Sequence, residues 1–150
     1  QLFHPGDLDY IHSVERISKL SNVISINGGV QLDLMGQENA ESTGTRQLSG
    51  VGGQMDFLEG AYRSKGGKGF ICINSSRVTK DGERKSNILA TIPGGSTISA
   101  PRTMIQYVAT EYGIASLSGK TLRERAEAMA SIAHPDFREE LMKYAQENFK

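Results

Sequence analysis

Short β-branched runs alternate with segments of helical periodicity along this chain, and this alternation limits the fold more than any other feature. The runs predict strands over residues 22–27, 31–35, 70–74, 88–92, 97–99 and 104–109. Apolar spacings of three and four predict helices over residues 9–20, 55–62, 122–133 and from 135 onward. The polar segment 36–47 is expected to be an extended loop. Strands that alternate with helices predict an α/β layered fold, and we expect one domain over residues 1–150.

Charge and cysteine content exclude several classes of partner. The 17 basic residues balance the 17 acidic ones, so no net field draws the chain to nucleic acid or to an anionic membrane. No apolar stretch is long enough to span a bilayer, and the N-terminus does not read as a signal peptide. The single cysteine, Cys72, lies in an apolar run where we expect a buried thiol. We therefore expect a cytoplasmic protein with no nucleic-acid or membrane partner.

A glycine loop, Gly50-Val51-Gly52-Gly53, opens the second predicted helix. Glycines let backbone amides approach a ligand that a side chain would exclude, and helix N-terminal amides favour negative charge. The loop could cradle a phosphate, donate hydrogen bonds to an oxyanion, or simply form a tight turn. The sequence satisfies neither the P-loop nor the dinucleotide-binding pattern, so the local motif leaves these three readings open.

Other candidate residues are ambiguous when taken alone. Lys65 lies beside a second glycine pair, where a lysine either meets an anion or is only solvated. Glu111 follows a predicted strand, where a carboxylate is exposed, caps a helix or takes part in chemistry. His134 precedes a helix start and is expected to be structural. The histidines and the cysteine do not have metal-ligand spacing, so we expect no metal site.

Several ordered segments resemble the acetyl-CoA hydrolase/CoA-transferase family. They include DLMGQENAES (33–42), SGVGGQMDF (49–57), SKGGK (64–68), TEYGIA (110–115) and IAHPDFR (132–138). The resemblance runs nearly from end to end. It implies the NagB/RpiA/CoA-transferase-like fold, an open α/β sheet with flanking helices, and a two-domain enzyme of which this chain is the C-terminal domain. Because the chain begins at Gln1, we expect it to be a fragment without the N-terminal domain.

The resemblance also implies a reaction. In that family a glutamate attacks an acyl-CoA thioester, and CoA passes to a short-chain carboxylate through a glutamyl-CoA intermediate. That glutamate lies upstream of the region matched here, so the chain alone is expected to be inactive. CoA is a substrate, no cofactor is expected to be bound covalently at rest, and a homo-oligomer is expected.

The resemblance assigns expected roles to seven positions. Gly52 and Gly53 are expected to donate backbone hydrogen bonds to the thioester oxygen, with Gly50 and Val51 beside CoA; losing one such donor typically costs about 3 kcal/mol. Glu111 is expected to line the reaction centre, and Lys65 to lie near CoA. His12 is a further candidate contact, at a position where relatives commonly have asparagine.

Other departures from the family leave the function open. Gly28-Gly29-Val30-Gln31 stands where relatives have Ser-Ala-Leu-Glu, and Met104 and Ser116 stand where they have aspartate. CoA transfer is the leading hypothesis. The alternatives are acyl-CoA hydrolysis, which differs in how well water is excluded, a non-catalytic CoA- or phosphate-binding module, and a purely structural domain.

Overall fold

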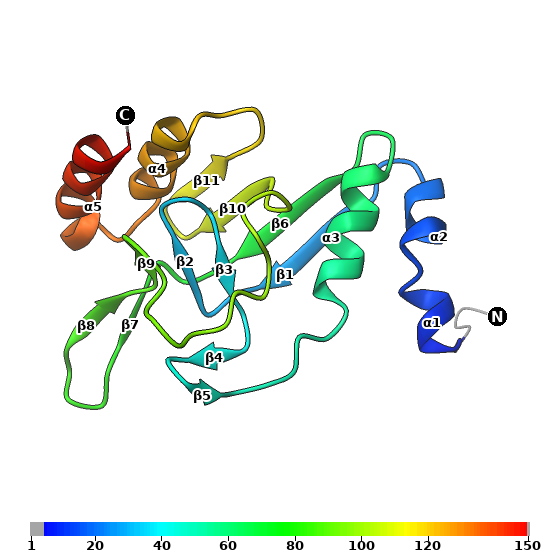
Figure 1. Cartoon of the computed structure of the whole chain (residues 1–150), viewed down its shortest axis with the longest axis horizontal. Coiled ribbons are helices and arrows are strands. Elements are labelled where there is room, and N and C mark those ends of the chain that lie inside the picture. The colour runs from blue at the N-terminus through cyan, green and yellow to red at the C-terminus, as the bar shows by residue number, and fades with distance from the viewer. Residues whose placement is uncertain (1–4, 150) are drawn as a thin grey trace.

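A four-stranded sheet forms the centre of the molecule in the computed structural model, which describes residues 5–149 (Figure 1). Its order is β1-β6-β10-β11, formed by β1 (Ile24–Gly28), β6 (Lys68–Cys72), β10 (Tyr107–Thr110) and β11 (Gly113–Ser116). The first three strands are parallel and β11 is antiparallel. The crossover from β1 to β6 includes helix α3 (Gln54–Arg63), so the predicted α/β arrangement is confirmed.

Short strands beside this sheet replace part of the loop expected over 36–47, so that prediction is wrong. Strands β2 (Gln31–Asp33), β3 (Glu38–Asn39) and β9 (Ile88–Leu89) form a three-stranded sheet. Two hairpins follow, β4 (Ser42–Thr43) with β5 (Arg46–Gln47), and β7 (Ser76–Val78) with β8 (Arg84–Ser86). The first half of this segment is buried at Glu38, Asn39, Glu41 and Ser42, and polar groups pair there: the Asn39 side-chain amide donates to the Ser42 carbonyl at 2.8 Å. Strand β5 remains exposed.

Most helix boundaries follow the sequence signals. Gln54 begins α3 directly after the glycine loop, and Thr121 and Glu124 form the expected capping box of α4 (Leu122–Ser131). Pro135 begins α5 (Pro135–Asn148), where the His134 side chain accepts a hydrogen bond from the Asp136 amide. The prediction of a single helix over residues 9–20 is wrong, because the structure has two helices there. The segment divides into α1 (Leu8–Ile11) and α2 (Val14–Lys19), because Ser13 caps a second helix start.

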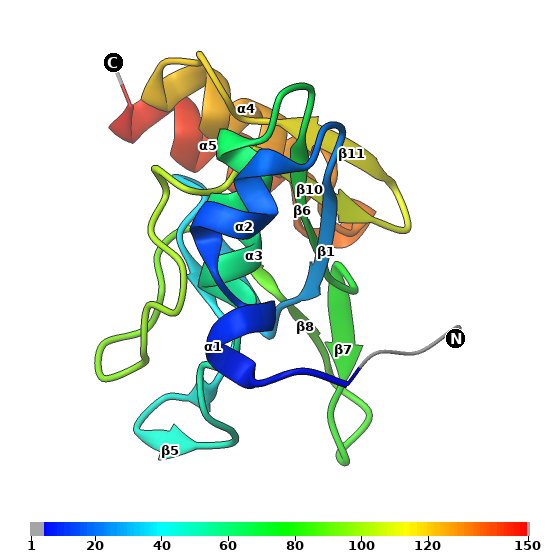
Figure 2. The same ribbon diagram turned by 90° about the vertical axis from the view of Figure 1, so that its right-hand side faces the viewer.

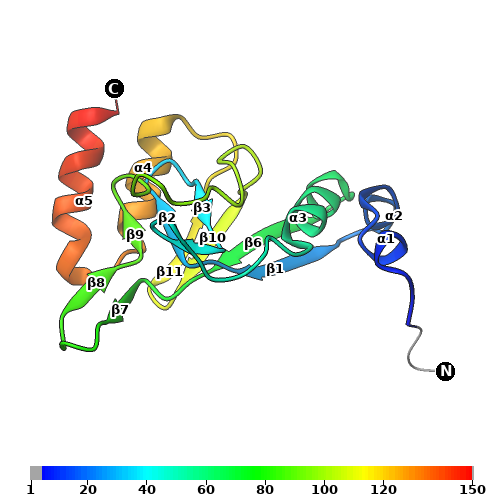
Figure 3. The same cartoon turned by 60° about the horizontal axis from the view of Figure 1, so that its bottom comes forward.

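The core lies on one face of the central sheet. Fully buried side chains there include Leu32, Leu58, Ile71, Val108 and Met129. Figures 2 and 3 show α3 on this side of strand β1. None of the helices between residues 5 and 149 is long and apolar enough to cross a membrane.

The opposite face of the central sheet is largely open and apolar. The strand register places Ile24, Ile26, Phe70, Tyr107 and Ile114 on it, and we call it the open face. Ile26 and Ile114 are 68% and 63% exposed. Cys72 also lies on this face and is exposed, so the predicted buried thiol is wrong. Alternate residues of a strand point to opposite faces of the sheet, so Gly69 and Ile71 of β6 point to the buried face.

Candidate active site

The carboxyl ends of the three parallel strands meet at one edge of the sheet. A hollow of about 430 Å³ lies there, and it is lined by Gly29, Cys72, Ile73, Asn74, Ala109, Thr110 and Glu111. Gly29 follows β1, Cys72 ends β6 with residues 73–74 just beyond it, and Thr110 ends β10 just before Glu111. Ligands of open α/β sheets bind at this kind of edge. The hollow is therefore the natural place to look for chemistry.

The glycine loop belongs to the same edge, because α3 runs from it back toward the start of β6. Gly52 has a φ of +60°, a left-handed conformation that favours glycine, and Gly53 is the N-cap of α3. Within residues 5–149, the backbone amides of residues 50–53 make no intramolecular hydrogen bond. The first bond at the helix start runs from the Phe57 amide to the Gly53 carbonyl at 3.2 Å. The loop thus offers uncommitted donors at a helix N-terminus.

His12 lies directly against this loop. A Cβ built on Gly53 would meet the His12 Cε1 at 2.1 Å, so no larger residue fits without moving the ring. His12 Nδ1 lies 3.4 Å from an Asp56 carboxylate oxygen, and the imidazole meets the Phe57 ring edge-on with centroids 5.1 Å apart. The structure therefore brings together His12 and Gly53, which the sequence separates by some forty positions.

Glu38 joins the glycine loop to the hollow. The Gln54 side-chain amide donates to Glu38 Oε2, while Glu38 Oε1 lies behind Gly29. Desolvation raises the pKa of Glu38 to about 8 against the opposing hydrogen bond from Gln54, so the carboxyl is mainly neutral at pH 7. Sequence reasoning missed this residue, because nothing in its local pattern indicates burial.

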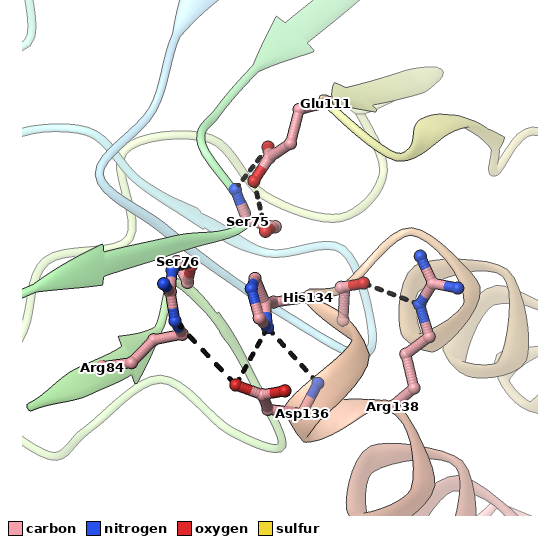
Figure 4. A network of polar contacts seen from close by, with 8 residues as sticks. Ser75, Ser76, Arg84, Glu111, His134, Asp136 and Arg138 are labelled. Atoms are coloured by element: carbon pink, nitrogen blue, oxygen red, sulfur yellow. Dashed lines mark hydrogen bonds and ion pairs between the residues drawn. The ribbon is translucent and has the colours of Figure 1, made fainter.

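Glu111 is fixed at the far side of the hollow by Ser75 (Figure 4). The Ser75 amide donates to one carboxylate oxygen at 2.9 Å and the Ser75 hydroxyl to the other at 2.6 Å. Partial desolvation raises the pKa of Glu111, but the Ser75 hydrogen bonds, the residue's own amide and nearby His134 outweigh it. The pKa therefore lies below its ordinary value, and Glu111 is an ionised acceptor at neutral pH.

The start of α5 packs against the turn that carries Glu111. The His134 ring meets the Tyr112 ring edge-on at 5.6 Å, and the Arg138 guanidinium lies 5.0 Å from the centre of the same ring. Arg138 also donates to the Ala133 carbonyl at 2.8 Å (Figure 4). His134 thus supports the turn and caps α5, which agrees with the structural role predicted for it.

Two predicted site residues, Lys65 and Val51, do not line the hollow. Lys65 is exposed just after the C-terminal end of α3, about 15 Å from the glycine loop at 1.5 Å per residue over ten residues. Val51 is 50% exposed at the tip of the loop. Within residues 5–149, no group of three or more His, Cys, Asp or Glu side chains could hold a metal ion.

Comparison with known proteins identifies the family. A model described as the acetyl-CoA hydrolase/transferase C-terminal domain matches residues 2–145. The chain belongs to the acetyl-CoA hydrolase/transferase family. The butyryl-CoA:acetate CoA-transferase of Anaerostipes caccae is 47% identical over 139 residues, which are 93% of this chain and 31% of that protein. The 4-hydroxybutyrate coenzyme A transferase of Clostridium kluyveri is 48% identical over 95% of this chain and 32% of its own length.

Solved structures confirm the expected fold, an open α/β sheet with flanking helices. RipA from Yersinia pestis matches with a TM-score of 0.81 at 39% identity, over 93% of this chain and 30% of that one. The 4-hydroxybutyrate CoA-transferase of Porphyromonas gingivalis matches with a TM-score of 0.73 at 40% identity, over 94% and 30%. The chain therefore spans about a third of the length of the family members it matches.

Proposed function

We propose that this chain forms the C-terminal part of a CoA-transferase, which moves CoA between an acyl-CoA thioester and a short-chain carboxylate through a glutamyl-CoA intermediate. The observation that carries the proposal is the set of uncommitted amides in residues 50–53, at the sheet edge that also holds the hollow and Glu111. The transferases named above, at 47% and 48% identity, support it. The attacking glutamate would come from the part of the enzyme that precedes this region.

The proposed chemistry uses the loop as an oxyanion site. The upstream carboxylate attacks the thioester carbonyl, and the oxygen that becomes negative accepts hydrogen bonds from the Gly52 and Gly53 amides. The C–S bond then breaks, which gives an acyl-glutamyl anhydride and CoA thiolate. The thiolate attacks the glutamyl carbonyl of the anhydride and releases the first carboxylate. A second carboxylate reverses these steps to form the new acyl-CoA.

The remaining site residues receive supporting roles. Glu111, with both oxygens held by Ser75, is suited to accept a hydrogen bond from the bound substrate rather than to attack it. His12 lies over Gly53 and would contact the substrate beside the loop. Gly50, Val51 and Lys65 would contact CoA, with Lys65 meeting a more distant part because it lies at the other end of α3.

A fusion enzyme tests the proposal. It joins the part of the Anaerostipes caccae transferase that precedes its matched region to this chain. We expect it to exchange CoA between acetyl-CoA and butyrate with parallel lines in double-reciprocal initial-rate plots, as a covalent intermediate requires. The chain alone should show no exchange. Intersecting lines from the fusion enzyme would contradict the scheme.

Acyl-CoA hydrolysis is the second candidate, because the acetyl-CoA hydrolase of Eremothecium gossypii is 32% identical over 89% of this chain. The two activities differ in whether water or a carboxylate attacks the covalent intermediate. Release of free thiol from acetyl-CoA in the absence of butyrate measures hydrolysis in the same fusion enzyme. Thiol release as fast as exchange would favour the hydrolase.

The open face would receive the rest of the enzyme, because its exposed Ile26 and Ile114 favour burial. We therefore predict that Cys72 reacts readily with a thiol reagent in this chain and at least about tenfold more slowly in the fusion enzyme, since burial restricts access to a thiol. Peptide mapping by mass spectrometry measures the label on Cys72. A cysteine placed at Lys80, on the β7–β8 turn, is the control and should react equally in both proteins. Equal labelling of Cys72 in both would place the interface elsewhere.

A further inference from the structure

Glu38 is buried at the candidate site, and no step of the proposed reaction uses it. Its side chain is 0% exposed, and its backbone is fixed on one side because its amide donates to the Ala100 carbonyl at 3.0 Å. The Ser99 amide donates to the Glu38 carbonyl at 2.8 Å. The side chain is therefore placed by an anchored backbone, not by a mobile loop.

The two oxygens of Glu38 face different parts of the site. Oε2 accepts a hydrogen bond from Gln54, the first residue of α3, whereas Oε1 has no hydrogen-bond partner within residues 5–149. A Cβ built on Gly29 would lie 2.7 Å from Oε1, so the absence of a side chain there makes room for the carboxyl. Gly29 also lines the hollow. Glu38 thus lies between the wall of the hollow and the start of the helix that carries the glycine loop.

We propose that Glu38 is the positioning residue of the glycine loop: through Gln54 it fixes the first turn of α3, and with it the Gly53 amide, relative to the hollow. This inference rests on the proposed function for its chemical meaning. Its structural part, the coupling between Glu38 and the loop, holds or fails independently of any activity.

The charge state of Glu38 makes the coupling measurable. Burial raises its pKa to about 8, so the carboxyl is mainly neutral at pH 7 and ionises a little above it. Two titratable groups of neighbouring elements make their contacts elsewhere. Asp33 on β2 accepts hydrogen bonds from Gln37, and His12 pairs with Asp56. Ionisation would strengthen the hydrogen bond that Oε2 accepts from Gln54, but it would also bury a charge whose Oε1 has no partner. The carboxylate would then move or admit water, and the helix start would shift with it.

Nuclear magnetic resonance of the 150-residue chain tests the coupling. We expect the amide shifts of Gly52 and Gly53 and the Gln54 side-chain signals to titrate with a midpoint near 8, and E38Q to abolish this step. A titration caused by any other group would persist in E38Q and is thereby distinguished from that of Glu38. E41Q is the matched control, because Glu41 is also buried with one unpartnered oxygen, and it should keep the step. Loop signals that do not titrate near 8, or that titrate alike in E38Q, would overturn the proposal.

The fusion enzyme supplies the functional readout. We expect kcat to fall about tenfold between pH 7 and pH 9 as Glu38 ionises, with the KM for acetyl-CoA nearly unchanged. E38Q should keep wild-type kcat at pH 7 and lose this alkaline fall, whereas E38A should lower kcat at both pH values. An active enzyme whose alkaline fall survives in E38Q contradicts the positioning role. An inactive fusion with the expected titration contradicts only the proposed function.

Discussion

The E38Q variant of this chain should gain stability over the wild type as the pH rises from 4.5 to 7, and the gain should reach about 3 kcal/mol. The cause is the desolvated carboxyl, whose folded-state pKa is about 8 instead of the ordinary 4.5. Below pH 4.5 the Glu38 carboxyl is protonated in both the folded and the unfolded wild type. Between pH 4.5 and pH 8 the unfolded chain releases the Glu38 proton more readily than the folded chain does. The wild type therefore loses stability with rising pH, whereas E38Q has no proton to release at this position and loses none from it.

Urea unfolding of the two proteins at several pH values measures this difference. Every other titratable group is shared, so the subtraction isolates Glu38. We expect the difference in unfolding free energy to rise between pH 4.5 and 8 and to level off above 8. A constant difference over this interval would mean that the carboxyl is ionised in the folded protein, and the description of its environment would then be wrong.

Gly53→Ala should lower CoA exchange by the fusion enzyme by about 100-fold, which is the usual cost of losing an oxyanion donor. The added Cβ would meet His12 Cε1 at 2.1 Å, so the ring or the loop must move. The amide stays present but is displaced from the thioester oxygen. We expect the loss mainly in kcat, because a donor that acts on developing charge contributes most in the transition state.

The double variant H12A/G53A separates crowding from other effects. Without the imidazole the Cβ has space, so Gly53→Ala should cost much less in the H12A background than in the wild type. Circular dichroism of each variant verifies the fold. An equal cost in both backgrounds would show that the His12 contact does not govern the loop, and no cost in either would remove Gly53 from the site.

The sequence predicts the central layer of the fold well because local signals and tertiary packing agree there. The β-branched runs at 22–27 and 70–74 became β1 and β6, and the glycine loop opened α3 as expected. The prediction of a loop over 36–47 is wrong because the polar residues of its first half are buried through mutual hydrogen bonds, such as that between Asn39 and Ser42. Strand β11 was not predicted, because it is a short segment whose strand conformation depends on its pairing with β10 across the turn at Glu111 and Tyr112.

The candidate site was predictable in part. The glycine loop could be chosen because it opens a helix, and Glu111 because it follows a strand; the resemblance to the family gave both their expected roles. Glu38 could not be chosen, because its importance depends on Gly29 and Gln54, which lie nine and sixteen positions away. Neither contact leaves a periodic or compositional signal. The exposure of Cys72 was missed for a related reason, since an apolar run does not show which face of a sheet is covered.

The mass of the fusion enzyme after mixing with acetyl-CoA, without an acceptor acid, tests most directly whether this chain completes a CoA-transferase site. The proposed reaction predicts a covalent adduct equal to CoA less one water, which disappears when butyrate is added and appears much more slowly in Gly53→Ala. A folded fusion enzyme that binds acetyl-CoA but never forms the adduct would contradict the account.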